Sequence, residues 1–261
     1  MFPAVIRSML LHISSIVWLL IHTVQEMGDH VFFRRRIPFR VSQFAEQADR
    51  TGAGSVPLVA LVSFFLGLTM ALLSGYVLKT FGQQRLVPNL VAIAFTRELG
   101  PLITGIVLAA RMGAAFTAEL GTMTVSEEVE AIEAMGIGAR RLLIGPRLIA
   151  IFLLMPCLVV VSDVTALIGG QMISKIAFDI NVLSFGSAAI NSLYLRDIVG
   201  GILKSFLFGG IIGTVSCYKG LAVKGGAAGV GDSTTSSVVT AITAVIGFDT
   251  LFNIVQTMLF S

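Results

Sequence analysis

Five stretches of apolar residues, each long enough to cross a lipid bilayer, constrain this chain more than any other feature of its sequence. The first covers residues 57–78, which are 22 residues without a charged side chain. A helix of that length is roughly 33 Å long, enough for a hydrocarbon core of about 30 Å. The other four cover residues 86 to about 118, 146–173, 198–218 and 238–260. We therefore expect an all-α integral membrane protein with five transmembrane helices.

The composition excludes the soluble classes of protein. Of the 261 residues, 55% are hydrophobic and 13% are charged, against about 25% charged residues in a soluble domain. The net charge of +3 is too small for a nucleic-acid surface and suits an anionic membrane. Cys157 and Cys217 lack the spacing of metal ligands, and the three histidines all precede the first apolar stretch. We expect no metal, no cofactor and no nucleic-acid partner.

The first 50 residues differ from the rest. Apolar residues recur every three to four positions between Val5 and Val24, which predicts a helix with one apolar face. Trp18 suits the headgroup depth of a membrane, so we expect this helix to lie along the interface and not to span it. The predicted division is therefore 1–50 for an amino-terminal interfacial helix with a basic linker and 51–261 for the membrane domain.

The distribution of basic residues predicts the orientation. When alternate connections are assigned to the two sides, one side receives only Lys79, Arg85, Lys175 and Arg196. The other side receives 11 basic residues, namely Arg34, Arg35, Arg36, Arg40, Arg50, Arg111, Arg140, Arg141, Arg147, Lys219 and Lys224. By the positive-inside rule, the amino terminus is cytoplasmic and the carboxyl terminus lies outside.

Small residues four positions apart occur in three of the expected spans. They are Gly67, Ala71 and Gly75, then Ala110, Ala114 and Ala118, and finally Gly209 with Gly213. Such ridges let helix backbones approach closely in lipid, where hydrophobicity does not drive helix association. Any single pair fits ordinary membrane-helix composition equally well, but three ridges favour a tightly packed bundle and allow a dimer.

Arg97 and Glu98 lie inside the second expected span. A charge there costs several kcal/mol by insertion scales, so both residues need partners, a wet cavity or a function. Sequence neighbours point about 100° apart on a helix and pair poorly with each other. Pro101 leaves the carbonyl of Arg97 without its helical donor, which predicts a kink. Two interpretations stay open, a buried ion pair that fixes helix register and a site that lines a substrate path.

Residues 122–136 connect the second and third spans on the predicted cytoplasmic side. We expect Thr124 or Ser126 to cap a helix and Gly136 with Gly138 to end it. Its carboxylates are Glu127, Glu128, Glu130 and Glu133, and its apolar strip is Val129, Ile132, Ala134, Met135 and Ile137. This pattern is typical of a helix that docks into a partner's groove. A helix on the membrane surface is the alternative, although anionic lipid would repel four acids.

The segment 226–233, GAAGVGDS, resembles a phosphate-binding loop except that Asp232 occupies the lysine position. That exchange reverses the charge offered to a phosphate, and no strand precedes the segment. We expect no nucleotide site here. The glycines predict a flexible cytoplasmic turn, with Ser233 or Thr234 capping the last span.

Several segments together resemble the MlaE family of membrane permeases. They are residues 97–101 (RELGP), 109–123 (AARMGAAFTAELGTM), 133–136 (EAMG), 146–147 (PR), 197–199 (DIV) and 204–205 (KS). The resemblance covers nearly the whole chain from about residue 55. It implies a non-catalytic permease subunit of an ABC transporter that moves phospholipids or related lipids between membranes. It also implies a homodimer, two cytoplasmic ATPase subunits, an extracytoplasmic MCE-domain protein, and a location in the cell inner membrane with a periplasmic carboxyl terminus.

The same resemblance assigns roles to two groups of residues. The implied ATPase-coupling helix contains Ser126, Glu127, Glu130, Glu133, Met135 and Gly136. The implied lipid pocket contains Leu72, Tyr76, Leu78, Arg97, Glu98 and Leu102.

An ion-coupled secondary transporter is the main alternative function. It would use intramembrane carboxylates such as Glu98, Asp163 and Asp249 as proton or ion carriers. The short chain without an obvious repeated half disfavours it, and the sequence leaves open whether Asp163 or Asp249 pairs with Lys204. An intramembrane enzyme is disfavoured because no histidine accompanies a carboxylate in the spans.

Overall fold

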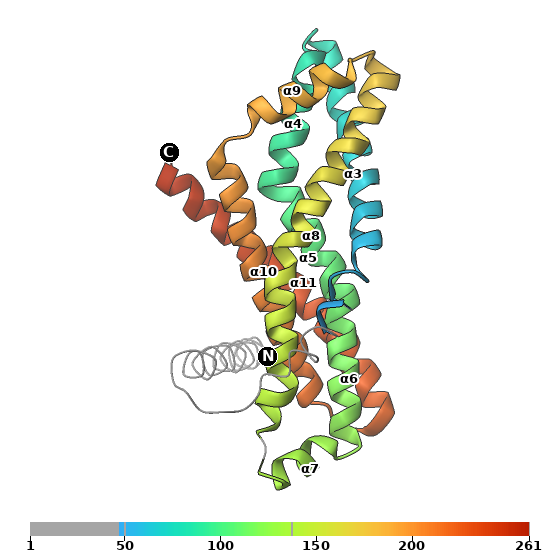
Figure 1. Ribbon diagram of the computed structural model, residues 1–261, viewed down its shortest axis with the longest axis vertical. Helices are drawn as coiled ribbons and strands as arrows, with labels where there is room; N and C mark the ends of the chain where they lie inside the picture. Colours follow the sequence, from blue (N-terminus) through green and yellow to red (C-terminus); the bar gives the residue numbers. More distant parts are fainter. Residues whose placement is uncertain (1–46, 50, 137, 261) are drawn as a thin grey trace, which may run out of the picture.

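The computed structural model describes residues 47–49, 51–136 and 138–260, and every regular element among them is helical (Figure 1). The elements of the first half are α3 (Val56–Thr80), η1 (Gln84–Leu86), α4 (Val87–Ala94), η2 (Phe95–Leu99), α5 (Gly100–Leu108), η3 (Ala109–Gly113) and α6 (Ala114–Val125). The remaining elements are α7 (Glu128–Ala134), α8 (Ala139–Phe178), α9 (Val182–Ser192), α10 (Leu195–Leu221) and α11 (Gly226–Phe260). The predicted interfacial helix and basic linker lie outside the described residues, apart from residues 47–49.

The described residues contain five helical segments long and apolar enough to cross a membrane, which confirms the predicted number. They are Val56–Thr80, Gln84–Val125, Leu142–Phe178, Leu195–Leu221 and Gly226–Met258. The second segment joins η1 to α6 and is 42 residues long, so it extends well beyond a bilayer of about 30 Å. After the carboxyl-terminal end of this segment, α7 folds back towards α8 at one end of the molecule's long axis (Figure 1). At the opposite end of that axis lie η1, the end of α8 and the start of α9.

The predicted flexible turn at residues 226–233 is wrong, because these residues form the first turns of α11. The turn instead lies at Gly225 and Gly226, with φ angles of +92° and +70°. Thr234 does not cap a helix but donates its hydroxyl hydrogen to the carbonyl of Val230, one turn earlier, at 2.7 Å. Val230 packs against Gly121 of α6, so tertiary contact stabilises helix where glycine alone favours a turn.

Two of the three small-residue ridges pack as predicted. A Cβ on Gly67 would lie 2.0 Å from the carbonyl oxygen of Ala166, so only glycine lets α3 approach α8 this closely. A Cβ on Gly213 of α10 would lie 2.6 Å from a side-chain methyl carbon of Leu148 on α8, so Gly213 lets α10 pack closely against that side chain. The third ridge does not form a close helix contact within the described part of the chain, since Ala110 is exposed and Ala114 is only half-buried.

The main core lies where α5, η3 and α6 meet α8, α10 and α11. Its fully buried members include Phe116, Met155 and Phe208. Within their most apolar 18-residue stretches, the outer helices α3 and α11 bury only 22% and 17% of the residues, against 44 to 50% for the other three spans. Much of the surface of α3 and α11 therefore remains for lipid or for another chain.

Two turns of the second span are π-helical, η2 and η3. Pro101 lacks an N–H, and at η2 the amide of Gly100 donates to the carbonyl of Phe95, five residues earlier. The kink expected at this position thus takes the form of a π-turn, a feature that often marks functional sites.

Candidate functional site

Lys204 of α10 lies at the centre of a polar network inside the bundle. Its side chain is fully buried, at 0% exposure. Its Nζ lies 2.8 Å from Glu98 Oε2, 3.0 Å from Asp249 Oδ1 and 2.6 Å from Asn253 Oδ1. An ammonium group in an apolar interior requires such compensation, because burial of an unpaired charge is very costly.

Asn253 connects the two carboxylates. Its Nδ2 donates to Glu98 Oε2 at 2.9 Å and lies 3.4 Å from Asp249 Oδ2. Glu98 comes from η2, whereas Asp249 and Asn253 lie one turn apart on α11. These four residues, Lys204, Glu98, Asp249 and Asn253, form what we call the polar cluster. It joins the second, fourth and fifth spans through side-chain contacts.

The π-turn contributes to the polar cluster. Lys204 Nζ donates to the carbonyl of Arg97 at 3.4 Å, and this carbonyl is the one that Pro101 deprives of its helical donor. The prediction that Glu98 finds its partner on another helix is therefore confirmed. Glu98 is the more open of the two carboxylates, with 31% of its side chain exposed against 12% for Asp249.

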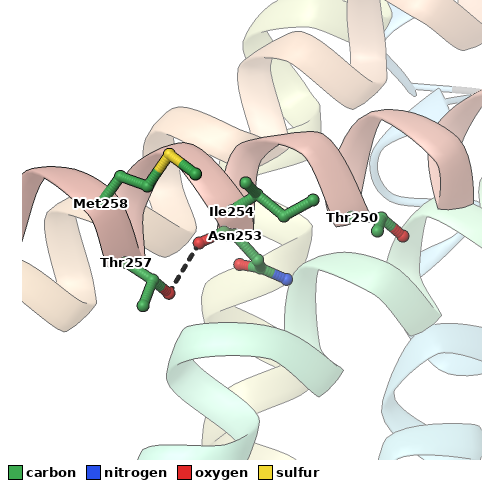
Figure 2. Close-up of a pocket in the computed structure, with 5 residues that line it drawn as sticks. All are labelled: Thr250, Asn253, Ile254, Thr257 and Met258. Atoms are coloured by element: carbon green, nitrogen blue, oxygen red, sulfur yellow. Dashed lines mark hydrogen bonds between the residues drawn. The ribbon is translucent and has the colours of Figure 1, made fainter.

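A shallow open hollow adjoins the polar cluster along the carboxyl-terminal half of α11. Its volume is about 440 Å³, and it is lined by Thr250, Asn253, Ile254, Thr257 and Met258 (Figure 2). The side chain of Asn253 belongs both to this wall and to the polar cluster. A molecule in the hollow would contact the charged network through Asn253 and apolar surface through Ile254 and Met258.

The connecting helix α7 projects from the opposite end of the molecule (Figure 1). Glu127, Glu128, Glu130 and Glu133 are all exposed, whereas Val129 and Ile132 are half-buried. Met135 is 66% exposed. The helix therefore presents carboxylates together with one large apolar side chain.

The ends of α7 differ in part from the prediction. Gly136 follows the helix with a φ of +76°, as the glycine predicted. Neither Thr124 nor Ser126 caps its start. Ser126 ends α6 and donates to the carbonyl of Thr122 at 3.0 Å, while Glu127, with a φ of +60°, is the N-cap residue directly before α7. Ile137 lies outside the described residues.

Comparison with known proteins decides the family. The family model described as Permease MlaE matches residues 44–255. This chain belongs to the MlaE permease family. A probable ABC transporter permease of Rickettsia typhi is 36% identical over 202 residues, covering 77% of this chain and 78% of that protein. A probable ABC transporter permease of Synechocystis is 34% identical over 200 residues, covering 77% and 76%.

A plant relative of this MlaE-family chain carries the name of a lipid. The chloroplast protein trigalactosyldiacylglycerol 1 of Arabidopsis thaliana is 38% identical over 200 residues, covering 77% of this chain and 57% of that protein. The resemblance stated from the sequence motifs is thus confirmed. The chain is a multi-pass membrane permease of the ABC transporter type.

The six residues implied to line a lipid pocket in this MlaE-family chain do not all lie at one site of the structure. Leu72 and Tyr76 lie exposed on α3, at 44% and 71%. Leu78 packs against the small core between α3, α4 and α8, and Leu102 packs against the main core. Of the six, Glu98 belongs to the polar cluster, and Arg97 contacts it through its backbone carbonyl. That all six residues line one lipid pocket stays a prediction.

Two further polar sites lie outside the polar cluster. Asp163 of α8 packs against Gly100 and not against Lys204, and its Oδ1 has no hydrogen-bond partner among the described residues. Arg147 of α8 pairs with Glu119 of α6 at 3.0 Å near the α7 end. The sequence left open whether Asp163 or Asp249 pairs with Lys204, and the structure shows that Asp249 does.

Proposed function

We propose that this MlaE-family chain is the membrane subunit of an ABC transporter that moves phospholipids or related lipids between membranes. Separate cytoplasmic ATPase subunits supply the energy. The match to the MlaE family over residues 44–255 is the observation that carries this proposal. The relatives named as ABC transporter permeases and the relative named after a galactolipid support it.

Coupling to the ATPase is assigned to α7. The helix lies at one end of the molecule, beyond the membrane-spanning segments, and exposes Glu130, Glu133 and Met135. A short helix with carboxylates beside an apolar side chain suits a groove with basic and apolar walls. We include Ser126, Glu127 and Gly136 in the same contact because they flank the helix and are exposed.

Lipid binding is assigned to the region around the polar cluster. A charged network with the partly exposed Glu98, beside a hollow that includes Ile254 and Met258, offers separate surfaces to a polar headgroup and to acyl chains. Arg97 and Glu98 border this region, and the exposed face of α3 with Leu72 and Tyr76 is completed by the second copy of the proposed homodimer. An extracytoplasmic MCE-domain protein receives or delivers the lipid.

Photocrosslinking tests the lipid assignment. A crosslinkable residue at Leu72 or Leu102 should capture phospholipid in cells, whereas one at Phe152 should capture much less. Phe152 of α8 is a matched control because it is 42% exposed and Leu72 is 44% exposed. Similar capture at all three positions would show general lipid exposure and would remove the pocket from the proposal.

The proposed location is the inner membrane, with α7 on the cytoplasmic side and the carboxyl terminus in the periplasm. In a variant without Cys157 and Cys217, a membrane-impermeant thiol reagent should label cysteine at Gly82 or Ser184 from outside. Cysteine at Ser126 should react only after the membrane is opened. The opposite pattern would invert the topology.

Asp232 provides the second cytoplasmic position for this labelling. It is exposed on the first turns of α11. The nearby Gly229 is not a suitable position for an introduced cysteine, since a Cβ there would lie 1.9 Å from the carbonyl oxygen of Lys224.

A further inference from the structure

The helix α9, between the third and fourth spans, has three different faces. Phe185 and Ala189 are buried, at 2% and 3% exposure, and pack with Ala92 of α4. This face fixes α9 to α4, near the start of the second span. The rest of its surface is divided between an apolar flank and a polar flank.

The apolar flank consists of Leu183 and Ile190, which are 81% and 71% exposed. Seven residues separate them, so they lie within about 20° of each other around the helix. Ser184 and Asn191 are exposed as well, and they lie roughly 100° and 80° round from Leu183, at 100° per residue. The exposed Ser187 lies between the two flanks, about 40° from Leu183. A helix with one apolar and one polar flank is typical of a membrane–water boundary.

The position of α9 agrees with such a boundary. It follows the end of α8 and precedes the start of α10, at the end of the molecule opposite α7 (Figure 1). Its apolar flank continues the exposed apolar surface of these spans, since Ile176 of α8 is 70% exposed and Leu195 of α10 is 76% exposed. Directly after α9, the guanidinium of Arg196 lies 5.4 Å from the ring centre of Tyr194, and tyrosine with arginine is typical of headgroup depth.

We propose that α9 is an interfacial helix whose Leu183–Ile190 flank is inserted among the acyl chains of the adjacent leaflet, while Ser184 and Asn191 face water. The helix, residues 182–192, contains no charged side chain, so insertion of this flank buries none. The occupant is the lipid surface itself, because the flank is continuous with the lipid-facing sides of α8 and α10. The inference does not depend on lipid transport.

Tryptophan fluorescence tests this placement in the full chain. The sequence has one tryptophan, Trp18, so a Trp18→Phe background leaves a single reporter after each substitution. Leu183→Trp, Ile190→Trp and the control Asn191→Trp are reconstituted into phosphatidylcholine vesicles with or without bromine on the acyl chains. Tryptophan octyl ester in the same vesicles gives the reference for quenching by contact with bromine.

For Leu183→Trp and Ile190→Trp we expect blue-shifted emission and at least half of the quenching that bromine produces on the reference. For Asn191→Trp we expect red-shifted emission and stronger quenching by acrylamide. Quenching of all three mainly by acrylamide would place the flank in water and overturn the proposal. Blue-shifted emission without bromine quenching would show that protein covers the flank, a second copy or a partner, and would overturn it too.

Discussion

Replacing Lys204 with methionine should lower the free energy of unfolding by about 3 to 5 kcal/mol, the cost typical of breaking a buried ion pair. The substitution leaves Glu98 and Asp249 without their cation, and Asn253 can compensate neither charge fully. It also removes the donor to the carbonyl of Arg97. Thermal unfolding of the purified permease in detergent measures the effect.

Lys219→Met is the matched control for this substitution. Lys219 is on the same helix, but it is only half-buried and its recorded hydrogen bond is to Ser236, at 3.0 Å. We expect its unfolding temperature to stay close to that of the parent. A Lys204→Met protein as stable as the Lys219→Met protein would contradict the structural importance of the polar cluster. Adding Glu98→Gln and Asp249→Asn to Lys204→Met should recover much of the loss, because no unpaired charge remains.

Glu98→Gln alone separates stability from transport. The amide oxygen still accepts from Lys204, and Asp249 remains as the counter-charge, so the unfolding free energy should fall by only about 1 kcal/mol. Lipid transport should nevertheless fall, because Glu98 is the carboxylate of the polar cluster more open to a bound molecule, with 31% of its side chain exposed. Normal transport in this variant would leave Glu98 with a structural role alone.

Reversing two charges on α7, Glu130→Lys with Glu133→Lys, should detach or uncouple the ATPase. Charge reversal at a desolvated contact costs about 2 to 5 kcal/mol or more, which is at least about 30-fold in affinity. Both side chains are exposed and remote from the core, so the permease itself should remain folded in the membrane. Recovery of the ATPase with the purified permease measures the effect.

Asp232→Lys serves as the control for the α7 reversal. Asp232 is also exposed and lies at the start of α11. We expect ATPase recovery and lipid transport to be unchanged in this variant. Normal recovery and transport in the double α7 variant would show that α7 does not couple the ATPase to the permease.

The spans were predictable because long uncharged stretches leave a chain few alternatives to helices that cross a membrane. Close packing of α3 was predictable too, since small residues four apart at Gly67 and Ala71 favour helix packing, but the sequence did not indicate that its partner is α8. The helical structure at the start of α11 was not predictable from the sequence. Its glycines favour a turn locally, and the packing of Val230 against Gly121 becomes visible only in three dimensions.

The polar cluster was predictable in part. The cost of an intramembrane charge marked Glu98, and Pro101 marked the carbonyl of Arg97. Asn253 carries no charge and sits in no motif that the sequence singled out, so nothing indicated its contact with Glu98 across 155 positions of the chain. The choice of Asp249 over Asp163 as the partner of Lys204 depends on helix rotation, which spacing alone does not fix.

The most direct test is ATP-dependent lipid movement by the assembled transporter. The permease is purified from native membranes with its copurifying subunits and reconstituted into vesicles that contain a fluorescent phospholipid. Transfer of that lipid is then measured with ATP and with a non-hydrolysable analogue. We predict transfer with ATP, none with the analogue, and none in the Glu130→Lys, Glu133→Lys variant. Transfer that proceeds equally with the analogue, or that follows an imposed ion gradient without ATP, would contradict an ATPase-driven permease and support an ion-coupled transporter.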